Sequence, residues 1–117
     1  MEALVLPAAS LVSLGLLLGW TAHASRGDGL ERNSLIGIRT RATMASDDAW
    51  HAGHRAAAGP LGVAAWSSGA TGVTGTVLAI AGSWLAGPAV AVGYVALVVL
   101  LVVATLRAAR AARSTSS

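Results

Sequence analysis

The chain has 117 residues, of which 55% are hydrophobic and only 11% are charged. Soluble domains carry about a quarter charged residues, so this composition argues against a protein surrounded by water. The absence of Cys excludes disulfides and thiolate chemistry.

The first apolar stretch, residues 4–24, contains no acidic residue and no Arg. About 20 such residues in a helix cross the hydrocarbon core of a bilayer, so we predict a membrane span here. Pro7 falls in the first turn, where a missing N–H is tolerated. A cleaved signal peptide is the alternative, but Met1 and Glu2 lack the positive charge with which such a peptide begins. We therefore expect the span to be retained.

Residues 25–60 are predicted to form a polar loop followed by an interfacial amphipathic helix. Ser46 can cap a helix whose first two residues are Asp, and acidic side chains suit the positive end of the helix dipole. Polar side chains then gather on one face and Trp50 lies on the other. Such a helix would rest in the headgroup region with Trp50 buried there. The sequence leaves open whether it kinks at Gly59-Pro60 or continues straight into the next span.

The second predicted span, residues 61–85, is uncharged but rich in Gly, Ser and Thr. Small residues recur in it at four-residue spacing, and in lipid such rows let helix backbones approach closely. The rows favour a central position between the other two helices, although chance in a Gly- and Ala-rich chain explains them equally well. The spaced pairs are Ala65/Gly69, Ser68/Gly72 and Thr71/Gly75.

The third predicted span, residues 88–106, is the most apolar of the three. We expect Gly87 to close the second helix in the left-handed conformation and Pro88 to begin the third. Tyr94, inside this span, is expected to donate its hydroxyl to a neighbouring helix. The tail, residues 108–117, is predicted to be disordered.

All eight basic residues are Arg, and they fall in only two segments, one between the first and second spans and one after the third. With three spans these segments share one side of the membrane, which the positive-inside rule makes the cytoplasm. We therefore predict an outside N-terminus and a cytoplasmic C-terminus in a bacterial cytoplasmic membrane, an origin that the Ala-, Gly- and Arg-rich composition indicates. The same topology explains the net charge of +3, so we expect no direct nucleic-acid contact.

The polar loop and the start of the following helix carry a combined motif, and two apolar helices come after it. The motif residues are Asn33, Ile36, Gly37, Ile38, Arg39, Thr40, Ser46, Asp48, Trp50, His54 and Arg55. This arrangement resembles the SdpI family of bacterial membrane proteins, whose pattern is an Asn, a Gly-Ile-Arg-Thr core, a Ser with an acid and a Trp, and a His-Arg before a span. We interpret residues 1–117 as a single short module of that kind, in which the motif residues serve structure or partner binding.

The resemblance implies immunity to a secreted toxic peptide and, for some members, a receptor role that holds a transcriptional repressor at the membrane. Two positions depart from the family pattern. Ser34-Leu35 replaces an aromatic residue after the Asn, and Arg41 replaces a Pro. The family fold therefore transfers more readily than either role.

Two sharper hypotheses concern charged residues of the motif. Arg39 could pair with Asp48 or with a lipid phosphate through its planar guanidinium, or it could be an ordinary solvated loop residue. Asp47, His51 and His54 invite a metal hypothesis. However, a structural zinc site needs about four ligands, so we expect neither a metal nor another cofactor.

These observations predict an all-α integral membrane protein with three transmembrane helices and an interfacial helix between the first and second. The expected function is SdpI-like immunity to, or sensing of, a membrane-active peptide. The alternative is an accessory subunit of a larger membrane complex, and the small-residue rows would also suit a homo-oligomer. No charged residue lies inside a span, which argues against a transport component. No catalytic set or nucleotide fingerprint is present, so we expect no enzyme.

Overall fold

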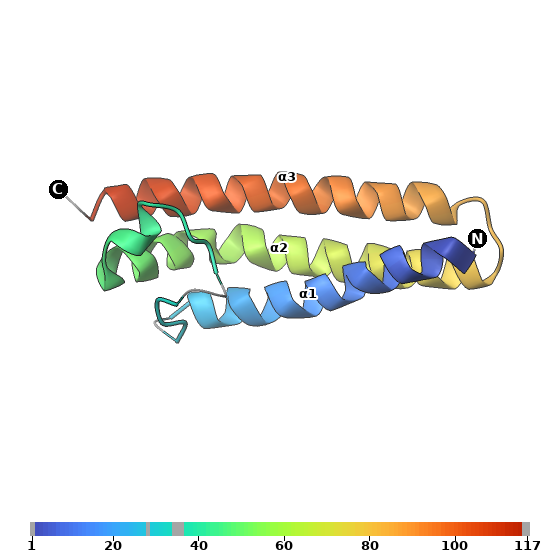
Figure 1. Cartoon of the computed structure of the whole chain (residues 1–117), viewed down its shortest axis with the longest axis horizontal. Helices are drawn as coiled ribbons and strands as arrows, with labels where there is room; N and C mark the ends of the chain where they lie inside the picture. Colours follow the sequence, from blue (N-terminus) through green and yellow to red (C-terminus); the bar gives the residue numbers. More distant parts are fainter. Residues whose placement is uncertain (1, 28, 34–36, 116–117) are drawn as a thin grey trace.

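The computed structural model describes residues 2–27, 29–33 and 37–115. Three long helices, each antiparallel to the next, lie side by side in an elongated bundle of 55 × 20 × 20 Å (Figure 1). Two short 3₁₀ helices precede the first and the second of them, and the described residues contain no strand. In chain order the elements are η1 (Glu2–Leu4), α1 (Val5–Ser25), η2 (Thr43–Ala45), α2 (Asp47–Ile80) and α3 (Ala86–Arg113).

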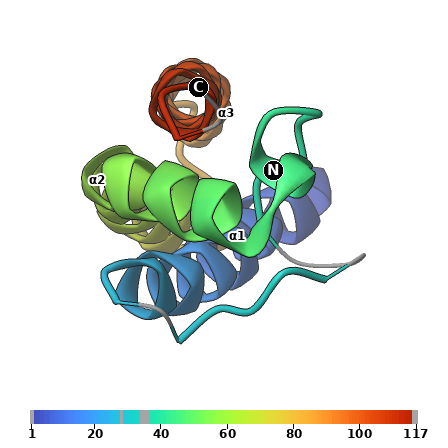
Figure 2. The ribbon, with the colours of Figure 1, turned by 90° about the vertical axis from the view of Figure 1, so that its left-hand side faces the viewer.

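Helix α2 lies between the other two. Helices α1 and α3 each pack along α2 but make little contact with each other, as the end-on view in Figure 2 illustrates. The predicted central position of the second span is therefore confirmed.

The outside of the bundle is apolar along most of its length. All three helices are long and apolar enough to cross a membrane. Large apolar side chains point away from the bundle, among them Trp66 at 83% and Ile80 at 74% exposure. Soluble monomers rarely expose so much contiguous apolar surface, whereas lipid solvates it. The predicted all-α fold with three spans is confirmed.

Two of the three small-residue rows, Ala65/Gly69 and Ser68/Gly72, lie in the contact between α1 and α2, whereas Thr71 and Gly75 lie against α3. A Cβ atom at Gly72 would lie 2.7 Å from the backbone nitrogen of Val12, and one at Gly15 would lie 2.9 Å from the carbonyl oxygen of Ala65. The Ser68 hydroxyl donates a 2.6 Å hydrogen bond to the Leu11 carbonyl. Backbones this close require small residues, so packing rather than chance explains the spacing here.

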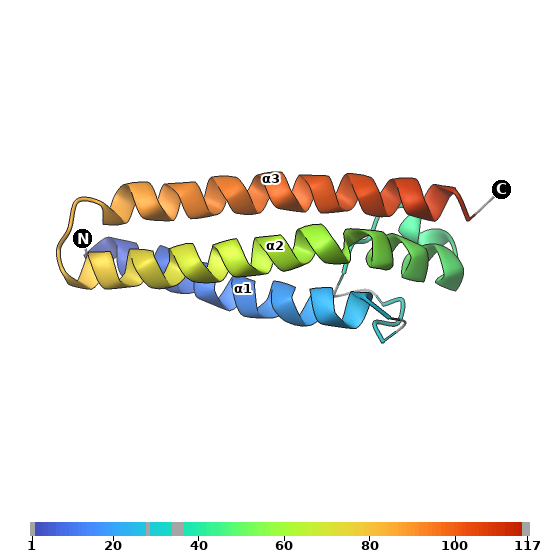
Figure 3. The ribbon, with the colours of Figure 1, turned by 180° about the vertical axis from the view of Figure 1, so that it is seen from behind.

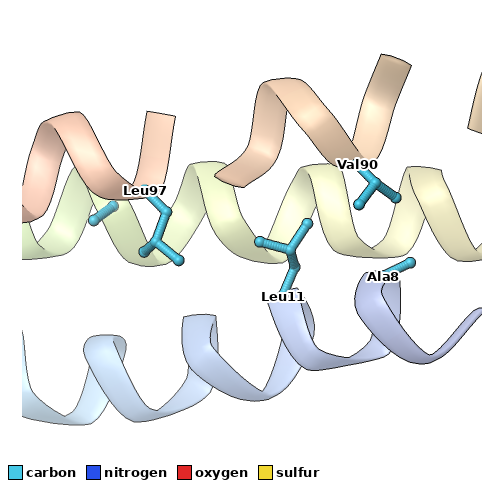
Figure 4. Close-up of a cluster of buried hydrophobic side chains, with 5 residues drawn as sticks. Ala8, Leu11, Val90 and Leu97 are labelled. Carbon is cyan, nitrogen blue, oxygen red and sulfur yellow. The ribbon is translucent and has the colours of Figure 1, made fainter. Parts of the chain in front are cut away.

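Side chains from all three helices meet in one buried cluster. In Figure 4, Leu11 of α1 points toward α3, from which Val90 and Leu97 point back. The Tyr94 hydroxyl of α3 donates a 2.9 Å hydrogen bond to the Pro7 carbonyl in the first turn of α1. This bond confirms the prediction that Tyr94 donates to a neighbouring helix.

The turn between α2 and α3 lies earlier than predicted. Helix α2 ends at Ile80 rather than at residue 85, and Gly82 takes the left-handed conformation with φ 72°. The Ser83 N–H bonds to the Leu78 carbonyl and the Gly82 N–H to the Ala79 carbonyl, which together close the helix in a Schellman motif. Gly87, predicted to have this role, lies in the first turn of α3 instead.

Helix α3 continues past the predicted end of its span at residue 106. It is helical to Arg113, so the segment expected to be disordered from residue 108 is ordered for almost two further turns. Ala and Arg are strong helix formers, and the guanidinium groups of Arg110 and Arg113 suit the negative end of the helix dipole. The last two residues, 116 and 117, lie outside the described part of the chain.

The expectation of a separate interfacial helix is not confirmed, because α2 runs without interruption from Asp47 through Pro60 to Ile80. The question of a kink or a straight continuation is thereby answered in favour of one helix. Packing at the start of α2 explains its continuity. A Cβ atom at Gly53 would lie 2.9 Å from the Ala108 carbonyl, so the first turns of α2 lie directly against the end of α3.

Candidate functional site

All Arg residues lie at one end of the bundle, which we call the basic end. It comprises the end of α1, residues 26–27, 29–33 and 37–46, the start of α2 and the end of α3. The beginning of α1 and the 81–85 turn lie at the opposite end (Figures 1 and 3). This arrangement agrees with the prediction that the two basic segments share a side. The residues are Arg26, Arg32, Arg39, Arg41, Arg55, Arg107, Arg110 and Arg113.

Trp50 is fully buried by protein at the basic end. Its indole N–H donates a 2.8 Å hydrogen bond to the carbonyl of Leu30, which is also buried. The prediction placed Trp50 in the lipid headgroup region, but Leu30 and Gly37 of the loop lie against it instead. The loop thus supplies both the apolar cover and the acceptor that a buried indole needs.

His54 lies one turn after Trp50 and is also buried, with the two ring centroids 4.1 Å apart. The backbone N–H of Ile38 donates to His54 Nε2 at 2.9 Å, so Nε2 must carry a lone pair. The proton is then on Nδ1, which donates to the Trp50 carbonyl at 2.8 Å. His54 is therefore a neutral imidazole that joins the loop to α2.

The surroundings of His54 favour this neutral form. Burial lowers the pKa of His54 below its usual value of 6.5, and the nearby His51 lowers it further, while the hydrogen bond to the Trp50 carbonyl raises it in part. His54 precedes the apolar part of α2, which begins at Leu61, so it lies at the boundary of the span.

Gly37 is the point at which the loop meets the two rings. Its φ of 111° lies in the left-handed region, which residues with a side chain rarely adopt. A Cβ atom there would also lie 2.6 Å from His54 Nε2 and 3.0 Å from the Trp50 ring. Both backbone conformation and space therefore demand glycine at this position.

Thr43, which the motif did not include, organises the loop after Gly37. It is fully buried, and its hydroxyl donates to the Ile38 carbonyl at 2.7 Å while accepting from the Thr40 N–H at 2.9 Å. The Thr40 hydroxyl in turn accepts from the Thr43 N–H at 3.1 Å. The spacing of two Thr residues three apart was the available sequence signal for this turn.

We call this assembly the loop-docking site. It consists of Leu30, Gly37, Ile38, Thr40, Thr43, Trp50 and His54. Ile38 extends it into the bundle, because its side chain packs against a buried cluster that includes Leu61 and Ala104. The loop is thus fixed to α2 and α3 by hydrogen bonds and apolar contacts together.

Other motif residues cap the helix or face outward. The Ser46 hydroxyl accepts from the Ala49 N–H at 3.0 Å, as predicted for a cap. Arg39 and Asp48 are both exposed, and an ion pair of this region joins Arg32 to Asp47 at 3.3 Å.

The remaining motif positions are peripheral to the loop-docking site. The Asn33 side chain donates to the Glu31 carbonyl at 2.8 Å, and Arg55 is exposed on α2. Ile36 lies outside the described residues, as do Ser34 and Leu35, where the family pattern is broken.

The arrangement does not favour metal binding at Asp47, His51 and His54. Both ring nitrogens of His54 are engaged by backbone groups, so it has no lone pair to offer a metal. Within residues 2–27, 29–33 and 37–115, no three His, Asp or Glu side chains come close enough to hold an ion. The chemistry of the site is therefore that of a structural contact between loop and helix.

A family model places these features in a wider context. The model of the SdpI/YfhL protein family matches residues 29–107, about two thirds of the chain. The match contains the whole loop-docking site, all of α2 and most of α3, and it leaves α1 outside. No curated protein and no solved structure gives a significant match.

Proposed function

Because the chain belongs to the SdpI/YfhL protein family, we propose that it gives a bacterial cell immunity to a membrane-active peptide, or senses one. The family residues lie at the basic end, which in this proposal faces the cytoplasm, as the positive-inside rule requires. The apolar helices meet the peptide within the membrane, and the loop at the basic end carries structure or signal.

The observation that supports this proposal is the division of the motif into two sets. Gly37, Trp50 and His54 bury one another and hold the loop in one conformation. Arg39 is two residues beyond Gly37 and exposed, so the docked loop presents its guanidinium outward. An Arg held on a fixed loop suits recognition of a carboxylate or phosphate, because less freedom is lost on binding.

The partner of Arg39 in this proposal is an acidic surface on the cytoplasmic side. By family resemblance, a repressor protein held at the membrane is one such partner. The transmembrane helices would then detect the peptide, and the exposed loop would pass the signal to the cytoplasmic partner.

The test compares a deletion strain, complemented with variants, for survival under challenge with a panel of membrane-active peptides. We expect Arg39→Gln to reduce protection to the level of the deletion strain while the protein stays in the membrane fraction. Arg41→Gln is the matched control, because Arg41 is equally basic, exposed and two residues away. Equal survival of the two variants would refute a specific role for Arg39.

The accessory-subunit hypothesis predicts a different result. Deletion would leave sensitivity to every peptide unchanged, and the tagged chain would co-purify with a larger membrane protein in fixed stoichiometry. That outcome would replace the immunity proposal.

A further inference from the structure

An open apolar groove of about 840 Å³ runs between α1 and α2 on the outside of the bundle. Its floor includes Gly15, Gly19 and Gly69, where the two backbones approach closely. Its walls include two exposed indole rings, Trp20 at 53% and Trp66 at 83% exposure. A Cβ atom at Gly69 would meet nothing within 4 Å, so the space above the floor is open.

The groove is continued toward the basic end by one row of residues on each helix. On α1 the row passes from Leu16 and Gly19 through His23 to Arg26, at the three- and four-residue spacing of one helix face. On α2 the corresponding row passes from Gly69 to Gly62. Both rows run toward the basic end.

Arg26 lies across the end of these rows. A guanidinium nitrogen of Arg26 is 3.7 Å from the position that a Cβ atom on Gly62 would occupy, so the side chain reaches over from α1 to α2. Arg26 is exposed and lies about two helical turns beyond Trp20, the last residue of α1 that lines the groove.

The groove and Arg26 together are shorter than the hydrocarbon core of a bilayer. On α1 the lining of the groove begins at Val12, and the rise from Val12 to Arg26 is about 21 Å, whereas the core is about 30 Å thick. A transmembrane helix would need an apolar surface that extends through both leaflets. A single lipid needs an apolar path through one leaflet and a charge at its end.

We propose that the groove binds one anionic phospholipid, with an acyl chain on the glycine floor between Trp20 and Trp66 and the phosphate on Arg26. Charge complementarity selects an anionic over a zwitterionic lipid, since basic sites between helices at the membrane surface attract anionic headgroups. The planar guanidinium can also donate two parallel hydrogen bonds to phosphate oxygens. This inference does not depend on the proposed function.

The two groove tryptophans make the binding measurable. The full chain with Trp84→Phe, which removes a ring in the turn between α2 and α3, is reconstituted in phosphatidylcholine vesicles. Brominated phosphatidylglycerol or brominated phosphatidylcholine is then titrated in, and fluorescence quenching gives the relative affinity of the two lipids. We expect the anionic lipid to bind more tightly.

Arg26→Gln should weaken the preference for phosphatidylglycerol about five-fold, the effect of one Arg near the membrane surface. Arg110→Gln removes the same charge from the end of α3 and should leave the preference unchanged. Equal loss in both variants would mean that only overall charge matters, and the proposed site would be wrong.

Gly69→Leu should fill the groove and abolish the preference, whereas Gly59→Leu should preserve it. Both glycines are helical with nothing within 4 Å of a Cβ atom, so helix content by circular dichroism should stay the same in both variants. Retained preference in Gly69→Leu would overturn the proposal. The proposal would also be overturned if Gly69→Leu abolished self-association of the chain and left the lipid preference unchanged, because the groove would then bind a second copy of the chain.

Discussion

The spanning part of the bundle and its basic end differ in what mainly holds them together. The contact between α1 and α2 depends on the absence of side chains, since Gly15 and Gly72 leave space for the backbone of the neighbouring helix. At the basic end it depends on polar groups that are present, buried and paired, as at Trp50 and His54. In lipid, apolar contact alone does not favour helix association, so close backbone approach and the interhelical hydrogen bonds of Ser68 and Tyr94 decide packing in the span.

Substitution of Gly72 tests the first half of this comparison and should have the largest effect. In Gly72→Ala the new methyl group would lie 2.7 Å from the Val12 nitrogen and 2.8 Å from the Ala8 carbonyl oxygen, which are backbone atoms that move only with α1 itself. We expect a loss of about 2–3 kcal/mol, the usual range for overpacking. Thermal unfolding in detergent, followed by circular dichroism, measures it.

Gly69→Ala is the matched control, because a Cβ atom there meets nothing within 4 Å. It should be neutral or stabilise the helix by about 0.5–1 kcal/mol, since Ala loses less conformational freedom than Gly. Equal destabilisation by both variants would show that backbone approach does not hold α1 against α2.

Substitution of Gly37 tests the second half and should have a somewhat smaller, local effect. Gly37→Ala forces a side chain into a left-handed conformation and against His54 Nε2. We expect the loop to detach with a loss of about 2 kcal/mol, while the three helices remain packed. Acrylamide quenching of Trp50 fluorescence measures the detachment, in a chain whose other three Trp residues are replaced by Phe.

Gly27 offers the control for this experiment, since it belongs to the same loop and a Cβ atom there has open space. Gly27→Ala should leave Trp50 protected from acrylamide. If Gly37→Ala also left it protected, the loop would not depend on Gly37 to reach the helix.

The sequence was sufficient for the spans and insufficient for their ends. Long uncharged runs can satisfy their backbone only as helices in lipid, so three spans follow from composition and length. The end of α2 is different, because Gly82 and Gly87 can both adopt the left-handed conformation that ends a helix. The sequence does not show which of them does so, whereas the hydrogen bonds of the turn identify Gly82. Continuity through Pro60 likewise depends on contacts between Gly53 and α3 that lie far apart in sequence.

The site shows the same division between local and long-range information. The Ser46 cap is local, and the sequence predicted it correctly. Helical periodicity placed Trp50 on an apolar face, but it cannot distinguish lipid from protein as the medium that covers that face. The loop that covers Trp50 returns to it from Leu30, 20 residues earlier, and no local pattern encodes that contact.

The smallest predicted effect concerns pH and asks whether the loop-docking site needs a neutral His54. Because burial lowers the pKa of His54 in the folded protein, the docked state binds a proton less readily than the undocked one. The stabilising contribution of His54 is therefore complete above about pH 6.5 and is lost as the pH falls below this value toward the lowered pKa. Protonation would place an N–H on Nε2 opposite the Ile38 N–H, so one hydrogen bond, worth about 1 kcal/mol, would be lost.

Trp50 should thus become more accessible to acrylamide under acidic conditions. His51→Gln should keep this response, whereas His54→Gln should remove it, because a glutamine carbonyl can accept from Ile38 without titrating. If His51→Gln removed the pH response instead, the response would not come from His54, and this prediction would be wrong.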